Sequence, residues 1–133
     1  MLKRMARGSS FQVFFTGPTT IGDAAQALSR KMHVVEDENG FTVRWPDVTE
    51  PELVVGLSAE PHIAVEAAEI AGYRKIDAFK AFDRRFEVYI DDLDKALDEI
   101  NTMNEVQLTL QDLTNGYIVR SWNGAIDPPH QAD

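Results

Sequence analysis

Two halves of the chain resemble each other, and this likeness restricts the fold more than any other feature of the sequence. FQVFF at 11–15 aligns with FEVYI at 86–90, which sets an offset of 75 residues. After one extra residue at Asn115, NGFTVRW at 39–45 aligns with NGYIVRSW at 115–122. A single gap over about 35 positions is more than two similar turns require, so we interpret the halves as two copies of one unit.

Both copies predict a strand followed by a helix. The segments 11–16 and 86–90 are short and rich in aromatic and β-branched residues, which favour strands. A Thr or Asp suited to an N-cap follows each strand. Apolar residues then recur at helical spacing, and the second copy shows this best, at Leu93, Leu97, Ile100 and Met103.

Each copy is predicted to end in a β-hairpin with an Asn-Gly turn, at 39–40 and at 115–116. This pair favours a type I′ turn, whose two central residues have positive φ. Before the second pair, Val106, Leu108 and Leu110 alternate with polar residues, as in a strand. The repeated unit is therefore βαββ. Two such units predict an α+β fold, with a mainly antiparallel sheet and helices packed on one face.

The length of 133 residues suits a single domain. The connection between the copies is predicted to be helical, because Pro61 suits a first turn and Ile63, Ala67 and Ile70 recur at helical spacing. The predicted organisation is a mobile N-terminus at 1–10, a first unit with an extra strand at 11–59, a helical connection at 60–85, a second unit at 86–126 and a loose tail at 127–133.

Composition restricts the partners and the compartment. The net charge is −9, so the surface repels phosphate; we expect no direct binding to nucleic acid and favour a basic protein as the partner. There is no cysteine, which is typical of a reducing cytoplasm and excludes disulfides. No apolar run approaches the roughly 20 residues that cross a bilayer, so we expect no membrane span.

Two acidic stretches supply the candidate partner-binding residues. These are Glu36, Asp37, Glu38, Asp91, Asp92, Asp94 and Asp98. A calcium loop is excluded at Asp92, because its sixth and twelfth positions are Leu97 and Met103 instead of Gly and Glu. Three structural interpretations stay open: helix capping in the second stretch, protection of a hairpin edge in the first, and solubility for both.

The sequence carries no recognisable catalytic motif. There is no GxSxG, no phosphate-binding loop and no GxGxxG. The three histidines are His33, His62 and His130, far apart and without the spacing of a zinc site. We therefore predict no catalytic residue, no metal and no cofactor. A basic and aromatic stretch at 73–86 is predicted to bury Ile76, Phe79 and Phe82 in the core.

A small, acidic, cysteine-free α+β chain of this kind resembles the immunity proteins of bacterial toxin systems, which bind a cognate toxin and block it. The resemblance is one of type over the whole chain and carries over no individual residue. It implies a non-enzymatic inhibitor that occludes a toxin. A toxin acting on nucleic acid has a basic active site, to which an acidic inhibitor is steered by its charge. Phage-encoded inhibitors of bacterial defence fit the same criteria.

Other interpretations stay open beside this one. The tandem units also resemble the vicinal-oxygen-chelate enzymes, which place metal ligands, often His and Glu, on paired strands. The positions that suggest such a set are Gln12, Glu87 and His33. A cupped sheet that binds a small ligand without metal is a variant of this hypothesis. A non-catalytic scaffold subunit, dimerising through exposed sheet edges, is the third alternative.

Overall fold

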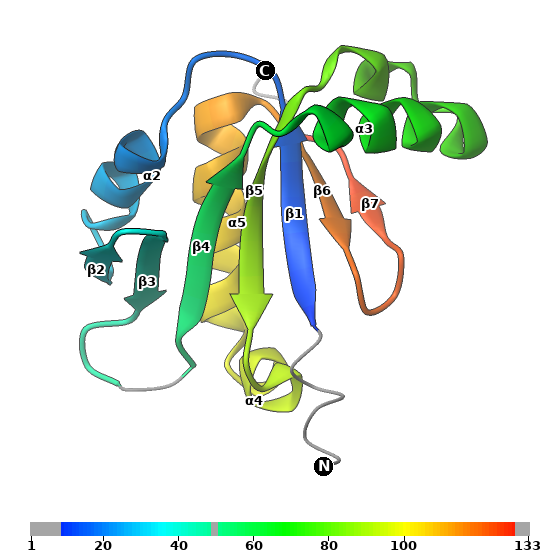
Figure 1. Cartoon of the computed structure of the whole chain (residues 1–133). Helices are drawn as coiled ribbons and strands as arrows, with labels where there is room; N and C mark the ends of the chain where they lie inside the picture. Colours follow the sequence, from blue (N-terminus) through cyan, green and yellow to red (C-terminus); the bar gives the residue numbers. More distant parts are fainter. Residues whose placement is uncertain (1–8, 49–50, 130–133) are drawn as a thin grey trace, which may run out of the picture.

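One antiparallel sheet organises the molecule. The computed structural model describes residues 9–48 and 51–129 (Figure 1). In these residues the sheet has seven strands in the order β2-β3-β4-β5-β1-β6-β7. The strands are β1 (Ser10–Phe15), β2 (His33–Asp37), β3 (Gly40–Arg44), β4 (Leu53–Ser58), β5 (Arg84–Ile90), β6 (Tyr117–Arg120) and β7 (Ile126–Asp127). The predicted α+β class with a mainly antiparallel sheet is confirmed.

The helices fill the connections between these strands. They are α2 (Ile21–Leu28), α3 (Pro61–Arg74), the 3-10 helix η1 (Asp77–Ala81), α4 (Leu93–Asp98) and α5 (Ile100–Thr114). The predicted connection at 60–85 contains α3 and η1 and runs into β5 at Arg84; Phe79 and Phe82 are buried, and Ile76 is partly buried against them. None of the described helices combines the length and the apolar character needed to cross a membrane.

Two chain crossings interlock at the centre of the sheet. Neighbouring strands are all antiparallel, so β1 is parallel to β4 with β5 between them, and β5 is parallel to β6 with β1 between them. The chain passes from β1 to β4 through α2 and the β2–β3 hairpin, and from β5 to β6 through α4 and α5. These are two interleaved split β-α-β units, the ferredoxin-like arrangement. Each predicted copy supplies one central strand and one crossing.

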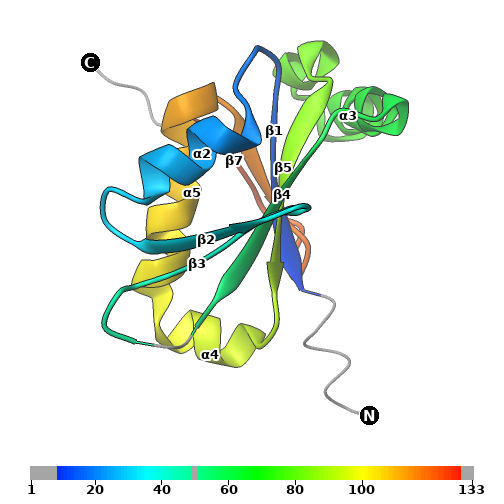
Figure 2. The ribbon, with the colours of Figure 1, turned by 60° about the vertical axis from the view of Figure 1, so that its left-hand side comes forward.

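Helices cover both faces of the sheet (Figure 2). On β1, Phe11, Val13 and Phe15 point into the core formed with α2 and α5, and Phe14 points to the other face. There Phe14 packs with the apolar residues of α3 and η1. We predicted helices on one face of the sheet only. Helices α2 and α5 do pack on one face, but α3 and η1 pack on the other, so the prediction is corrected. The connecting segment has its own apolar stripe, which requires a second buried surface.

The second predicted hairpin is wrong, because its first strand is part of α5. Met103, Val106 and Leu110 recur at intervals of three and four residues and are buried, whereas Leu108 is 49% exposed. The segment that we predicted as a strand from its alternating residues therefore also has the spacing of a buried helix face. Asn115 ends α5 with a left-handed φ of 59°, and its N–H donates to the carbonyl of Gln111. The second Asn-Gly pair is a helix end.

The first hairpin is confirmed, with its turn one residue earlier than predicted. Glu38 and Asn39 form the turn, and the Asn39 N–H donates to Oδ1 of Asp37 at 2.8 Å. Gly40 begins β3 with φ 150°, where a Cβ atom would lie 2.1 Å from the Val55 carbonyl oxygen. The two NG-containing stretches are thus similar in sequence but differ in turn geometry. The strands that follow the turns also differ in position: β3 lies within the connection from β1 to β4, whereas β6 is the strand at the end of the connection from β5.

The end of the described chain is held to the domain. Ile126 and Asp127 form β7 and pair with β6, and Pro129 is buried. The side-chain N–H groups of Gln111 donate to the carbonyls of Asp127 and Pro128. The predicted loose tail is therefore corrected as far as Pro129, and its remainder lies outside the described residues. Of the predicted mobile N-terminus, 1–8 lie outside them too, and Ser9 and Ser10 are buried.

Candidate functional site

Half of one sheet face has no helix over it among the described residues. On this side α3 and η1 pack over β1, β6 and β7, and leave β2, β3, β4 and the end of β5 open (Figure 1). The strand register brings Val35, Thr42, Val54 and Tyr89 into one row across the four strands. We call this surface the open sheet face; its side chains include Val35, Asp37, Thr42, Val54, Glu87 and Tyr89, and the register places His33 and Arg44 on the same side.

Three of the four residues in this row are large, apolar and exposed. Val35 is 51% exposed, Val54 45% and Tyr89 50%, although each belongs to a strand of the central sheet. Alternation explains why they lie outside the core: in β4 the neighbours Leu53 and Val55 are fully buried on the α2 and α5 side. A strand buried on one face only leaves its other residues to solvent or to a partner.

A hollow lies beside this row, in the next row of residues. The register pairs Asp37 with Gly40 and Gly56 with Glu87, so the floor between the two carboxylates carries no side chain. The hollow has a volume of about 300 Å³. We call it the glycine hollow, and its lining residues include Asp37, Gly40, Val54, Gly56, Glu87 and Tyr89.

A chain of charged groups supports one wall of the glycine hollow. Arg85 is 8% exposed and its guanidinium donates to Glu66 of α3 at 2.6 Å and to Glu87 at 2.7 Å. The same guanidinium lies over the Phe14 ring, 5.4 Å from its centroid. The hydroxyl of Tyr89 donates to the other oxygen of Glu87 at 3.1 Å. Glu87 is therefore fixed between two donors on its own strand.

The two residues that donate to Glu87 have shifted pKa values. Burial lowers the pKa of Arg85, but its hydrogen bonds to Glu87 and Glu66 outweigh burial and leave that pKa raised. Burial raises the pKa of the Tyr89 hydroxyl, and the negative charge of Glu87 raises it further. Arg85 thus stays charged, and Tyr89 stays a neutral hydrogen-bond donor at ordinary pH.

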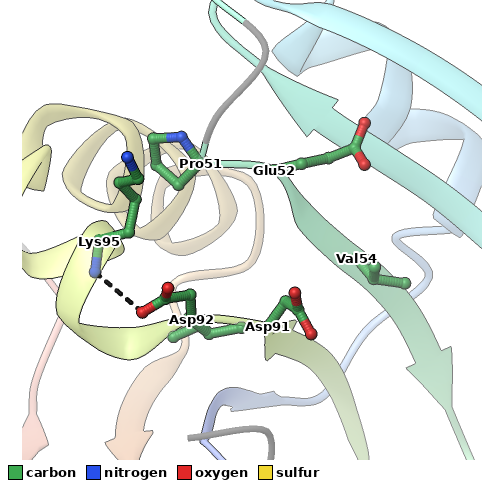
Figure 3. A pocket seen from close by; sticks show the side chains of 7 residues that line it. Pro51, Glu52, Val54, Asp91, Asp92 and Lys95 are labelled. Atoms are coloured by element: carbon green, nitrogen blue, oxygen red, sulfur yellow. Dashed lines mark hydrogen bonds between the residues drawn. The ribbon is translucent and has the colours of Figure 1, made fainter. Parts of the chain in front are cut away.

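A second hollow of about 440 Å³ adjoins the open sheet face where β5 meets α4 (Figure 3). We call it the acidic notch, and its lining residues are Pro51, Glu52, Val54, Ile90, Asp91, Asp92 and Lys95. Asp92 caps α4, since its carboxylate accepts the Lys95 backbone N–H at 3.2 Å. Val54 lines both hollows, so carboxylates lie on two sides of this exposed valine.

The structure brings three of the seven predicted partner-binding residues together around Val54. Asp37 lines the glycine hollow, and Asp91 and Asp92 line the acidic notch. The other four do not line either hollow. Glu36 pairs with buried Phe41 and so points to the opposite face, Glu38 lies in the hairpin turn, and Asp94 and Asp98 are exposed on α4.

Val54 and Tyr89 were not predicted as site residues, and Glu87 was named only as a possible metal ligand. Their signal is the alternation along β4 and β5, where every second residue faces the buried core. The sequence predicted these strands only as an extra strand of the first unit and as the first strand of the second copy. Which part of the alternating faces stays uncovered depends on the sheet order and on where α3 and η1 pack.

The positions that suggested a metal enzyme are only partly together. Gln12 and Glu87 are direct partners across β1 and β5. The Glu87 carboxylate already accepts from Arg85 and Tyr89, and His33 lies on the edge strand β2. Among the residues that the structure describes, no group of three or more His, Cys, Asp or Glu side chains is arranged to hold a metal ion.

No family model, no curated protein and no solved structure matches this chain. A fold shared by many unrelated activities does not specify one of them. The open sheet face offers three exposed apolar side chains, two hollows and a carboxylate fixed at Glu87.

Proposed function

We propose that this chain is a non-enzymatic acidic inhibitor that docks a basic protein on its open sheet face, in the manner of an immunity protein that occludes a bacterial toxin in the cytoplasm. The observation that carries the proposal is the exposed row of Val35, Val54 and Tyr89 with carboxylates beside it. An apolar centre with a polar rim is the usual anatomy of a protein interface.

The two parts of this surface have different physical roles. Carboxylates at the rim steer a basic partner and raise its association rate, an effect that salt screens. Burial of the exposed part of each large side chain in the row contributes roughly 1 kcal/mol at about 25 cal/mol per Å². The apolar row therefore favours slow dissociation, and the acidic rim favours fast association.

Nucleic acid fits this face poorly. An open sheet with an exposed aromatic residue on a central strand can stack RNA bases, and Tyr89 has such a position. However, Asp37, Glu87 and Asp91 beside the row repel phosphate. Arg85, the cation nearest to them on β5, is already bound to two carboxylates. A basic protein satisfies both the charge and the apolar row.

A homodimer through the open sheet face is disfavoured by the same charges. Two copies meeting there would bring two acidic surfaces together, and like charges across an interface are unfavourable. A phage-encoded inhibitor of bacterial defence would use the same acidic surface. These two inhibitor classes differ in the identity of the partner and not in the docking face.

The test uses the purified product of the neighbouring gene as the partner. We expect it to bind with an association rate that falls roughly tenfold or more as salt is raised. The double variant Asp37→Lys/Asp91→Lys is expected to weaken binding strongly. The control Asp94→Lys/Asp98→Lys changes the net charge by the same amount, but its two residues lie on α4 outside both hollows, so it should weaken binding less. Salt-independent binding, equal effects of the two double variants, or no binding would contradict the proposal.

The metal-enzyme alternative has one observation in its favour, the direct pairing of Gln12 with Glu87 on the central strands. Metal analysis of the purified chain separates the two functions. Stoichiometric bound metal that is lost in Glu87→Gln would support an enzyme similar to the vicinal-oxygen-chelate proteins. Purified chain without metal that binds the basic partner would support the inhibitor.

A further inference from the structure

The floor of the glycine hollow is open because of one residue in particular. Gly56 lies in the interior of β4, where glycine weakens a strand and often marks close approach of a ligand or another backbone. Its backbone does not need glycine: φ is not in the left-handed region, and a Cβ atom would meet only the Asn39 carbonyl oxygen, at 3.7 Å. The backbone at this position would accept a larger residue, so the effect of glycine here is to leave the hollow open.

The walls of the hollow suit a cation. Asp37 stands at one side and Glu87 at the other. Each oxygen of Glu87 already accepts one hydrogen bond, from Arg85 or Tyr89. A carboxylate has about four acceptor positions, so this fixed group can accept two more bonds. Because Arg85 and Tyr89 hold Glu87 in place, little freedom is lost when a cation binds.

The size and the aromatic wall select the kind of cation. The volume of about 300 Å³ is at the lower limit of ligand pockets, which suits one side chain. Tyr89, half exposed, offers a ring beside the carboxylates. A planar guanidinium can stack on such a ring and bind carboxylates with two hydrogen bonds, whereas an ammonium is compact and strongly hydrated.

We infer that the glycine hollow receives one arginine side chain of the protein partner, with its guanidinium beside Glu87 and Tyr89. This inference rests on the proposed function and names the recognition group of the partner. Charge complementarity supports it, because the hollow has a carboxylate on each side and the chain carries a net charge of −9. Val54 at the edge of the hollow packs against the apolar stem of the arginine.

The test is an NMR titration of the full chain with N-acetyl-arginine-methylamide. Its citrulline analogue is the uncharged probe of the same shape. We expect saturable shifts of the Gly56 and Tyr89 amide signals with a millimolar Kd, and roughly tenfold weaker binding of the citrulline probe. Equal binding of the two probes, or arginine shifts centred outside the hollow, would overturn the inference.

Two variants of Gly56 test the space directly. Gly56→Leu fills the hollow and is expected to abolish arginine binding, and Gly72→Leu on the exposed side of α3 is the control that keeps it. Gly56→Ala is expected to raise Tm, because alanine suits a strand better than glycine, and still to weaken arginine binding. A gain in Tm with weaker binding excludes misfolding as the cause. Unchanged arginine binding in Gly56→Leu contradicts the inference.

The partner assay distinguishes this inference from the proposed function. If the basic partner binds Gly56→Leu as tightly as the unaltered chain, the hollow is not its recognition site, although the open sheet face can still be the docking surface. If the arginine probe binds and no basic protein does, the inhibitor function is wrong and the hollow remains a guanidinium site.

Discussion

The Nε atom of Arg85 lies 2.7 Å from a carboxylate oxygen of Glu87, two residues further along β5. Residues i and i+2 of a strand share a face, so the sequence spacing itself brings this pair together. Glu66 of α3 completes the ion pair from the other side. The guanidinium therefore joins the half of the face that α3 covers to the half that stays open.

Replacing Arg85 by leucine is expected to destabilise the fold by about 2 kcal/mol, because Glu87 loses its charged donor in a partly buried site. The value lies below that for a fully buried pair, since the Glu66 side chain is 44% exposed and can be hydrated. Urea unfolding measures the change. Glu66→Gln is the control and should cost less than about 1 kcal/mol. An equal loss in both variants would show that the pair with Glu66, and not the bond to Glu87, accounts for the contribution of Arg85.

Alkaline pH should lower the stability through Tyr89. Its pKa is raised in the folded chain, so its contribution is complete below the unfolded value of about 10 and is lost as pH rises through the folded value. In that window the folded state holds the proton and the unfolded state releases it. Tyr89→Phe should flatten the fall in stability there, measured by urea unfolding across a pH series. A Tyr73→Phe variant, at an exposed position of α3, is the comparison for the loss of one phenol.

Thr102→Val is expected to stabilise the fold by about 1 kcal/mol. Thr102 is 1% exposed, and its hydroxyl has no hydrogen-bond partner among the described residues. A buried hydroxyl without a partner is costly, and valine has nearly the same shape. Thermal unfolding measures the gain. Thr109→Val, which removes a hydroxyl bonded to Glu105, is the matched change on the same helix and should bring no gain.

Much of the fold was predictable from local patterns. The first strands of both copies, α2, the first hairpin and the helical connection follow from alternation, helical spacing and cap residues, which act within a few residues. The segment 106–111 was predicted wrongly, because Val106 and Leu110 fit both a strand and a helix. Helix α5 prevails because both side chains reach the core formed with α2 and β1.

The candidate site was predictable only in part, because it depends on long-range pairing. The charge of Asp37, Asp91 and Asp92 is visible in the sequence, but their proximity to Val54 comes from the order of β2 to β5. Which face stays open depends on where α3 packs, a property of the whole chain. The role of Gly56 could not be predicted from the sequence, because it depends on a backbone that does not require glycine and on the hollow that this residue lines.

The most direct test of docking on the open sheet face compares two exposed valines. Val54 lies at the centre of this face, and Val65, 58% exposed, lies on α3. The affinity of Val54→Arg and Val65→Arg for the basic partner is measured by calorimetry. We predict a loss of roughly a hundredfold for Val54→Arg, as for a central interface residue, and little change for Val65→Arg. Equal affinities, or the larger loss in Val65→Arg, would contradict this account of the molecule.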